Sequence, residues 1–125
     1  MSAIIARLPR SPDSVRIARR LVQSHASGLG ATRREDAGLL VSELVTNALV
    51  HGRGAIALQI DRGFDHLRIE VADEGEGTIA LNPAPGVSGG WGLRVVDRFA
   101  ASWGIRQGSH RVWFRLDLDA RPTGR

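Results

Sequence analysis

The sequence lacks cysteine, lysine and any long apolar run, and each absence narrows what the protein can be. Without cysteine, the 125 residues can form no disulfide, thiolate nucleophile or thiolate metal site. This agrees with a reducing compartment, so the expected location is the cytoplasm. No apolar stretch approaches the roughly 20 residues of a membrane helix, and an arginine interrupts the short apolar N-terminus, so we expect neither a membrane span nor a secretory signal.

The positive charge of the chain comes entirely from arginine. There are 17 basic and 13 acidic residues, and the formal net charge is +4. The arginines are dispersed along the chain, and a uniform use of arginine for lysine is more typical of biased coding than of a surface selected for phosphate contacts. We therefore expect no direct nucleic-acid partner.

Length and periodicity indicate one domain of mixed structure. Apolar residues at helical spacing predict helices over 12–27, 33–50 and 92–101. Alternating apolar residues predict strands over 55–60, 67–72, 103–107 and 111–119. This order predicts an α+β fold, a two-layer α/β sandwich in which three main helices cover a mostly antiparallel mixed sheet.

The domain is expected to span residues 1–118. Residues 78–90 are rich in Pro, Gly, Ser and Asn, and a loop of this length in a small domain is usually functional or disordered. We therefore predict a mobile segment over 78–90, and a mobile tail over 119–125.

The second predicted helix carries polar residues in a very apolar context. Glu43, Asn47 and His51 are four residues apart and so share one helix face. A carboxylate can act as a general base, and an amide oxygen is a hard ligand that suits Mg²⁺. An ordinary solvated polar face has the same spacing, so the spacing alone leaves both interpretations open.

Two glycine-rich segments follow. An apolar strand leads directly into Asp73, Gly75 and Gly77, where the carboxylate can accept a hydrogen bond from an exocyclic amine and the glycines let the backbone approach a flat ligand. An Asp-Gly turn explains the same residues. Gly90 and Gly92 precede a helix, where exposed N–H groups favour an anion. The second segment has neither the Gly-Lys-Ser/Thr of a P-loop nor the directly preceding strand of a dinucleotide fingerprint.

In this order, the three segments resemble the N box, the first glycine box (Asp-x-Gly-x-Gly) and the second glycine box (Gly-x-Gly-Leu) of the histidine-kinase-like ATPase superfamily. Four stretches are similar to one branch, the anti-sigma-factor serine kinases and their short actinobacterial relatives: Glu43-Leu-Val-Thr-Asn47-Ala, His51-Gly52, Gly92-Leu-Arg-Val-Val-Asp97 and Val112-Trp-Phe114. The resemblance covers roughly residues 10–118.

The resemblance implies that the chain binds ATP with Mg²⁺. It implies that Asn47 holds the metal against the phosphates and that Asp73 reads the adenine amino group. It further implies that Gly75 and Gly77 flank the base, and that Glu43 is the base toward a protein serine hydroxyl, or toward water in ATP-hydrolysing relatives.

For the phosphates, the resemblance implies contacts with Gly90, Gly92 and the helix that starts at Leu93. Residues 78–90 would then form the lid of the site. Relatives commonly carry a Thr before the Val-Trp-Phe strand, where its hydroxyl supports the adenine-reading aspartate. Here Arg111 stands at that position, preceded by His110. Whether Asp73 keeps a side-chain support, and whether ATP binds as tightly as in such relatives, therefore stays open at this point.

Three functions are compatible with the resemblance. The first is a serine/threonine protein kinase that phosphorylates an anti-anti-sigma-type partner and so regulates transcription. The second is a non-catalytic, ATP-dependent module that sequesters a sigma factor or another regulator. The third, a fragment of a sensor histidine kinase, is disfavoured because such kinases usually have Asn where Glu43 stands.

Relatives of this branch often work as homodimers, and a homodimer is a further expectation. The apolar segment Ala3–Ala6 is a candidate surface for self-association. A strand that extends the edge of the chain's own sheet would look identical in the sequence, and that intramolecular use is the commoner outcome.

Overall fold

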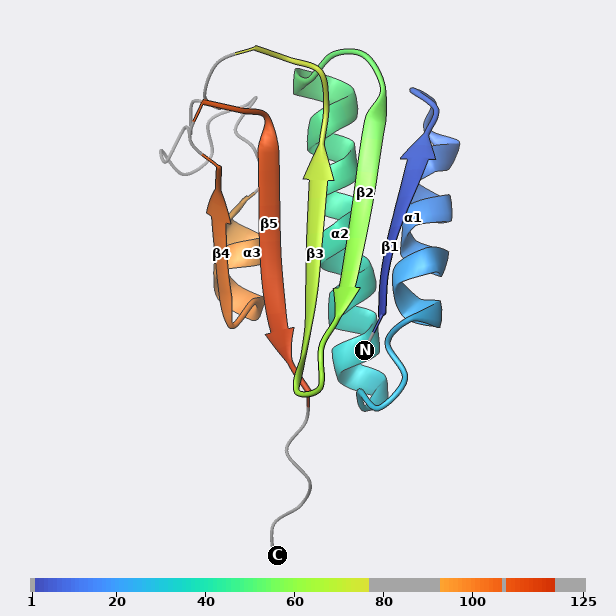
Figure 1. Cartoon of the computed structure of the whole chain (residues 1–125), viewed down its shortest axis with the longest axis vertical. Helices are drawn as coiled ribbons and strands as arrows, with labels where there is room; N and C mark the ends of the chain where they lie inside the picture. Colours follow the sequence, from blue (N-terminus) through green and yellow to red (C-terminus); the bar gives the residue numbers. More distant parts are fainter. Residues whose placement is uncertain (1, 77–92, 107, 119–125) are drawn as a thin grey trace, which may run out of the picture.

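The structure is a computed structural model that describes residues 2–76, 93–106 and 108–118. Within these residues the chain forms five strands and three helices (Figure 1). In chain order the elements are β1 (Ser2–Leu8), α1 (Asp13–Ser24), α2 (Ala31–His51), β2 (Ile56–Arg62), β3 (His66–Ala72), α3 (Leu93–Phe99), β4 (Ser102–Ile105) and β5 (Arg111–Asp117).

The strands form a single layer in the order β1-β2-β3-β5-β4, and every pairing in the described sheet is antiparallel. All three helices lie on one face of this sheet (Figure 1). The expected two-layer α+β sandwich is thus confirmed. In the part of the chain that the structure describes, no helix has both the length and the apolarity needed to cross a membrane.

The N-terminal strand β1 was missing from the predicted order of elements. It pairs with β2 along its whole length, from Ser2 opposite Arg62 to Leu8 opposite Ile56. The apolar segment Ala3–Ala6 therefore extends the chain's own sheet. The ends of the seven predicted elements differ from the structure by at most three residues.

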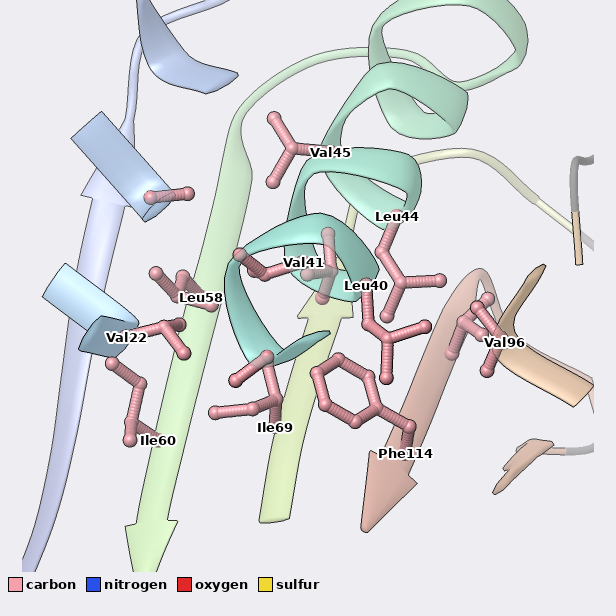
Figure 2. Packing of buried hydrophobic residues seen from close by; sticks show 14 of the residues in the cluster. Val22, Leu40, Val41, Leu44, Val45, Leu58, Ile60, Ile69, Val96 and Phe114 are labelled. Carbon is pink, nitrogen blue, oxygen red and sulfur yellow. The ribbon is translucent and has the colours of Figure 1, made fainter. Parts of the chain in front are cut away.

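The helix α2 occupies the centre of the helical layer, with α1 on one side and α3 on the other (Figure 1). Figure 2 shows its side chains Leu40 and Val41 pointing toward Ile69 of β3 and Phe114 of β5, and all four are fully buried. Neighbours on three sides bury nine of the 21 residues of α2, including the polar residue Asn47. The helix is therefore a rigid support for that side chain.

The turn of the β2–β3 hairpin lies at one end of the sheet, and the C-terminal end of α2 lies at the other end (Figure 1). The His66 imidazole forms a hydrogen bond with the Asp65 carboxylate there, with 2.8 Å between Nδ1 and Oδ1. This bond holds the pKa of Asp65 below its usual value. Both residues lie far from the polar face of α2 described next.

Candidate functional site

The polar face of α2 carries a buried amide without a partner. Asn47 is 5% exposed, and within the described residues its Nδ2 group finds no hydrogen-bond acceptor. A buried donor left unsatisfied costs about 1–3 kcal/mol, so such a group indicates a place where a ligand atom completes the bond. Glu43, one turn earlier on the same face, is half-buried, and no described residue hydrogen-bonds to it or pairs with it.

The carboxylate of Asp73 lies just beyond the end of β3 and is 2% exposed. Its Oδ1 atom accepts three hydrogen bonds, from the backbone N–H of Gly75 (2.7 Å), from His110 Nδ1 (2.9 Å) and from the backbone N–H of Arg53 (3.3 Å). Among the described residues none donates to Oδ2. The carboxylate is therefore held through one oxygen, and the other oxygen remains as an acceptor.

The end of α2 and the Asp73 carboxylate are in direct contact, and this contact requires glycine at position 52. A Cβ atom on Gly52 would lie 2.2 Å from Asp73 Oδ2 and 2.7 Å from the carbonyl oxygen of Ala48. The φ angle of Gly52 is −97°, which any residue adopts, so glycine is needed for space and not for conformation. The contact brings the helix of Asn47 and the carboxylate of Asp73 into one site.

The loop after α2 is held by contacts on two sides. The Arg10 guanidinium donates to the carbonyl oxygens of Leu49 (2.7 Å), Gly52 (3.3 Å) and Gly54 (3.2 Å). Such a cation satisfies the free carbonyls at a helix C-terminus and interacts favourably with the helix dipole. On the other side, Gly54 has a φ of +67°, and a Cβ there would lie 2.0 Å from Glu74 Oε1. The loop that supports Asp73 therefore has little freedom to move.

Comparison with protein families places the chain in a family. Residues 8–116 match the histidine kinase-like ATPase domain. The chain belongs to this family. A search of curated proteins found no match. The family match covers α2, β3 and β5, and it supports ATP binding and a kinase-like ATPase function for the domain.

Several predicted residues of this ATPase domain lie outside the described residues. They are Gly77, Gly90, Gly92 and the predicted lid, 78–90. Leu93 is described as the first residue of α3 and is 7% exposed, packed in the hydrophobic core. Its side chain is therefore a core side chain, and only its backbone is available to a ligand.

Asp73 does have a side-chain support, and the residue before β5 provides it. Arg111, the first residue of β5, points to the sheet face that carries no helix, where its Nη1 donates to Glu70 Oε2 (2.9 Å). Neighbouring residues of an extended chain point to opposite faces. His110 therefore points the other way, and its imidazole holds Asp73.

The residues of this ATPase domain also fit a magnesium ion. In the described part of the chain, no group of three or more His, Cys, Asp or Glu side chains is placed to hold a metal. Mg²⁺ usually keeps several waters and is held by one or two protein oxygens together with phosphates. Asn47 offers one such oxygen from a buried and fixed position, which suits a metal that a nucleotide brings with it.

Three residues that shape the site were not among the predicted site residues. Gly52 belonged to a stretch that resembles the anti-sigma-factor branch but was assigned no role in the site, and neither Arg10 nor His110 was assigned one. The signal for His110 lies in the strand register, since Ala72 pairs with Arg111 and the next antiparallel pair is Asp73 with His110. That signal requires knowing that β3 neighbours β5, which the hairpin patterns alone do not show.

Replacing Gly52 with Ala should destabilise the ATPase domain by about 1–3 kcal/mol, because the added methyl group would overlap the Asp73 carboxylate and the Ala48 carbonyl. Urea unfolding followed by circular dichroism measures this change. Thr46→Ala is the matched control, since Thr46 is exposed on the same helix. An unchanged free energy of unfolding for Gly52→Ala would contradict the close contact between α2 and Asp73.

Proposed function

We propose that this ATPase domain is a serine/threonine protein kinase of the anti-sigma-factor branch, and that it regulates transcription by phosphorylating an anti-anti-sigma-type protein. The observation that carries the proposal is the state of Glu43. Its half-buried carboxylate lies one turn from Asn47 and is bound by no other described residue. A carboxylate in this state keeps its full capacity to accept a proton from a substrate hydroxyl.

In the proposed complex, the adenine amino group donates a hydrogen bond to Asp73 Oδ2, the acceptor that the described residues leave open. Asn47 holds Mg²⁺ through its amide oxygen, while its unpaired Nδ2 group donates to a phosphate oxygen. Gly75 and Gly77 flank the base. When bound, Mg²⁺ neutralises charge on the phosphates.

A second group of residues is proposed to bind the phosphates. Gly90, Gly92 and the backbone at Leu93 contact the phosphate groups, and residues 78–90 cover them. Contacts of this kind come from backbone N–H groups, so glycines suit them because they add no side-chain bulk.

For phosphate transfer, the serine hydroxyl oxygen attacks the γ-phosphorus while Glu43 accepts the hydroxyl proton. The bond between the γ-phosphorus and the β–γ bridging oxygen breaks, and ADP leaves with that oxygen. The protein contributes mainly by positioning and by proton removal, since the phosphoryl group itself needs little covalent help.

The direct test is phosphate transfer to an anti-anti-sigma-type protein from the same genome. We expect mass spectrometry to find one phosphoserine on that partner after incubation with the ATPase domain, ATP and Mg²⁺, and none when the partner's serine is replaced by alanine. If no phosphate is transferred but a sigma factor binds only in the presence of ATP, the non-catalytic sequestering module is the better description.

The partners of this function are an anti-anti-sigma-type protein, a sigma factor, or both, and we propose that a homodimer binds them. The strand β1 is used within the chain's own sheet, but it lies at an edge, so one side of it has no strand partner in the described sheet. Light scattering at tens of micromolar protein decides this point. A mass near 13.5 kDa, that of one chain, would contradict the homodimer.

A further inference from the structure

The His110 imidazole is the one side chain among the three described donors to Asp73 Oδ1. We propose that His110 is a positioning residue, which fixes the orientation of the Asp73 carboxylate and thereby sets the preference of the site for an adenine amino group. This inference rests on the proposed placement of adenine at Asp73.

The bond between His110 and Asp73 is short and shielded from water. Its length is 2.9 Å, and the side chains are 13% and 2% exposed. An ionised carboxylate only accepts hydrogen bonds, so the proton of this bond lies on Nδ1 of the imidazole. A charge-assisted bond of this kind, shielded from water, is stronger than an ordinary surface hydrogen bond.

The backbone around His110 is arranged to bring its ring to this place. The N–H group of Asp73 donates to the carbonyl oxygen of His110 (3.2 Å), which extends the pairing of β3 with β5 by one residue. A Cβ atom on Gly75 would lie 2.3 Å from His110 Nδ1. The ring therefore occupies the space that any side chain at position 75 would need, so Gly75 serves the histidine as well as Asp73.

The two oxygens of Asp73 differ in what they offer a ligand. Rotation of the carboxylate would break the bonds that Oδ1 receives from Gly75, Arg53 and His110. Oδ2 is therefore held on the side of Gly52 as a fixed acceptor. A fixed acceptor bonds well to an amine donor and repels a carbonyl oxygen, and a site of this kind discriminates strongly between analogues.

The experiment compares ATP with inosine triphosphate, which carries a carbonyl in place of the adenine amine. His110→Leu removes the donor, whereas His110→Asn keeps a nitrogen at nearly the position of Nδ1. Arg111→Gln is the control, because Arg111 is the adjacent residue but bonds to Glu70 on the opposite face. Titration calorimetry gives the affinity of each variant for both nucleotides, and thermal melting reports whether each variant is folded.

We expect His110→Leu to bind ATP about tenfold more weakly, as for the loss of one charge-assisted bond, with less than about a twofold change for inosine triphosphate. His110→Asn should bind ATP within about threefold of the wild type. Arg111→Gln should match the wild type for both nucleotides.

Three results would overturn the inference. If His110→Leu binds ATP like the wild type while Asp73→Asn binds it weakly, the placement of adenine stands and the role of His110 is wrong. If Asp73→Asn also binds ATP like the wild type, the placement of adenine fails as well. If both His110 variants lose ATP and inosine triphosphate equally, His110 has a structural role only.

Discussion

Phosphate transfer to the partner should fall by about 10²–10⁴-fold when Glu43 is replaced with Gln, the usual contribution of a general base. Glutamine keeps the size and the polarity of the side chain but cannot take the proton of the attacking hydroxyl. Because no described residue hydrogen-bonds to Glu43, the substitution removes no structural contact that the structure records. The affinity for ATP should therefore stay within about twofold, since in the proposed complex Asn47 and Asp73 hold the nucleotide and Glu43 contacts the attacking hydroxyl.

The measurements are the single-turnover rate of phosphoserine formation and the dissociation constant of ATP. Glu35→Gln is the matched control, because Glu35 is an exposed glutamate of the same helix and the change in charge is identical. Unchanged transfer in Glu43→Gln would rule out Glu43 as the base. A loss of ATP affinity in Glu43→Gln, without a loss in Glu35→Gln, would instead place Glu43 among the residues that bind nucleotide.

The helices and hairpins of the fold could be predicted because their signals are local. The central helix α2 is long and largely apolar from Ala37 to Val50, glycine follows it directly, and the strand β3 alternates apolar with polar residues. A strand in the chain's own sheet was the commoner interpretation of Ala3–Ala6, but β1 was not placed in the order of elements because it forms no hairpin with the next element. Its partner β2 begins at Ile56, beyond two intervening helices, and pairing over that distance leaves no turn signal in the sequence.

Local sequence signals likewise predict some residues of the candidate site and not the contacts that hold them. Asn47 and Asp73 stood out because each interrupts an apolar element with a polar side chain at a particular place. The contacts that hold Asp73 could not be predicted, since Gly52 and His110 approach it from residues far along the chain. The question about Arg111 arose from comparing positions without the alternation of β5, which sends residues 110 and 111 to opposite faces.

This alternation also explains what Arg111 does. The carboxylate of Glu70 is 3% exposed on the sheet face without helices, where it pairs with Arg111 (2.9 Å) and Arg68 (3.2 Å). The Arg68 guanidinium in turn lies 5.0 Å from the centre of the Trp113 ring. A buried carboxylate needs such partners, because leaving its charge unpaired would be strongly destabilising. Arg111 thus stabilises the sheet next to the site, because its guanidinium forms an ion pair with Glu70.

Replacing Asp73 with Asn should weaken ATP binding by about 10–150-fold, which corresponds to the 1.5–3 kcal/mol of a hydrogen bond to a charged group. The reason is the geometry of the carboxylate. The amide oxygen of Asn would keep the place of Oδ1, because three donors converge there from Gly75, His110 and Arg53. The amide nitrogen would then take the place of Oδ2, and a donor would face the adenine amino group.

The same geometry predicts a reversed preference among nucleotides. The amide nitrogen of Asp73→Asn can donate to a carbonyl oxygen, so inosine triphosphate should bind this variant better than ATP does. Titration calorimetry with both nucleotides measures the reversal. Asp65→Asn on the distant hairpin makes the same chemical change and should alter neither affinity. If Asp73→Asn loses both nucleotides equally, the carboxylate acts by holding the loop after α2, and the acceptor for adenine must lie on another residue.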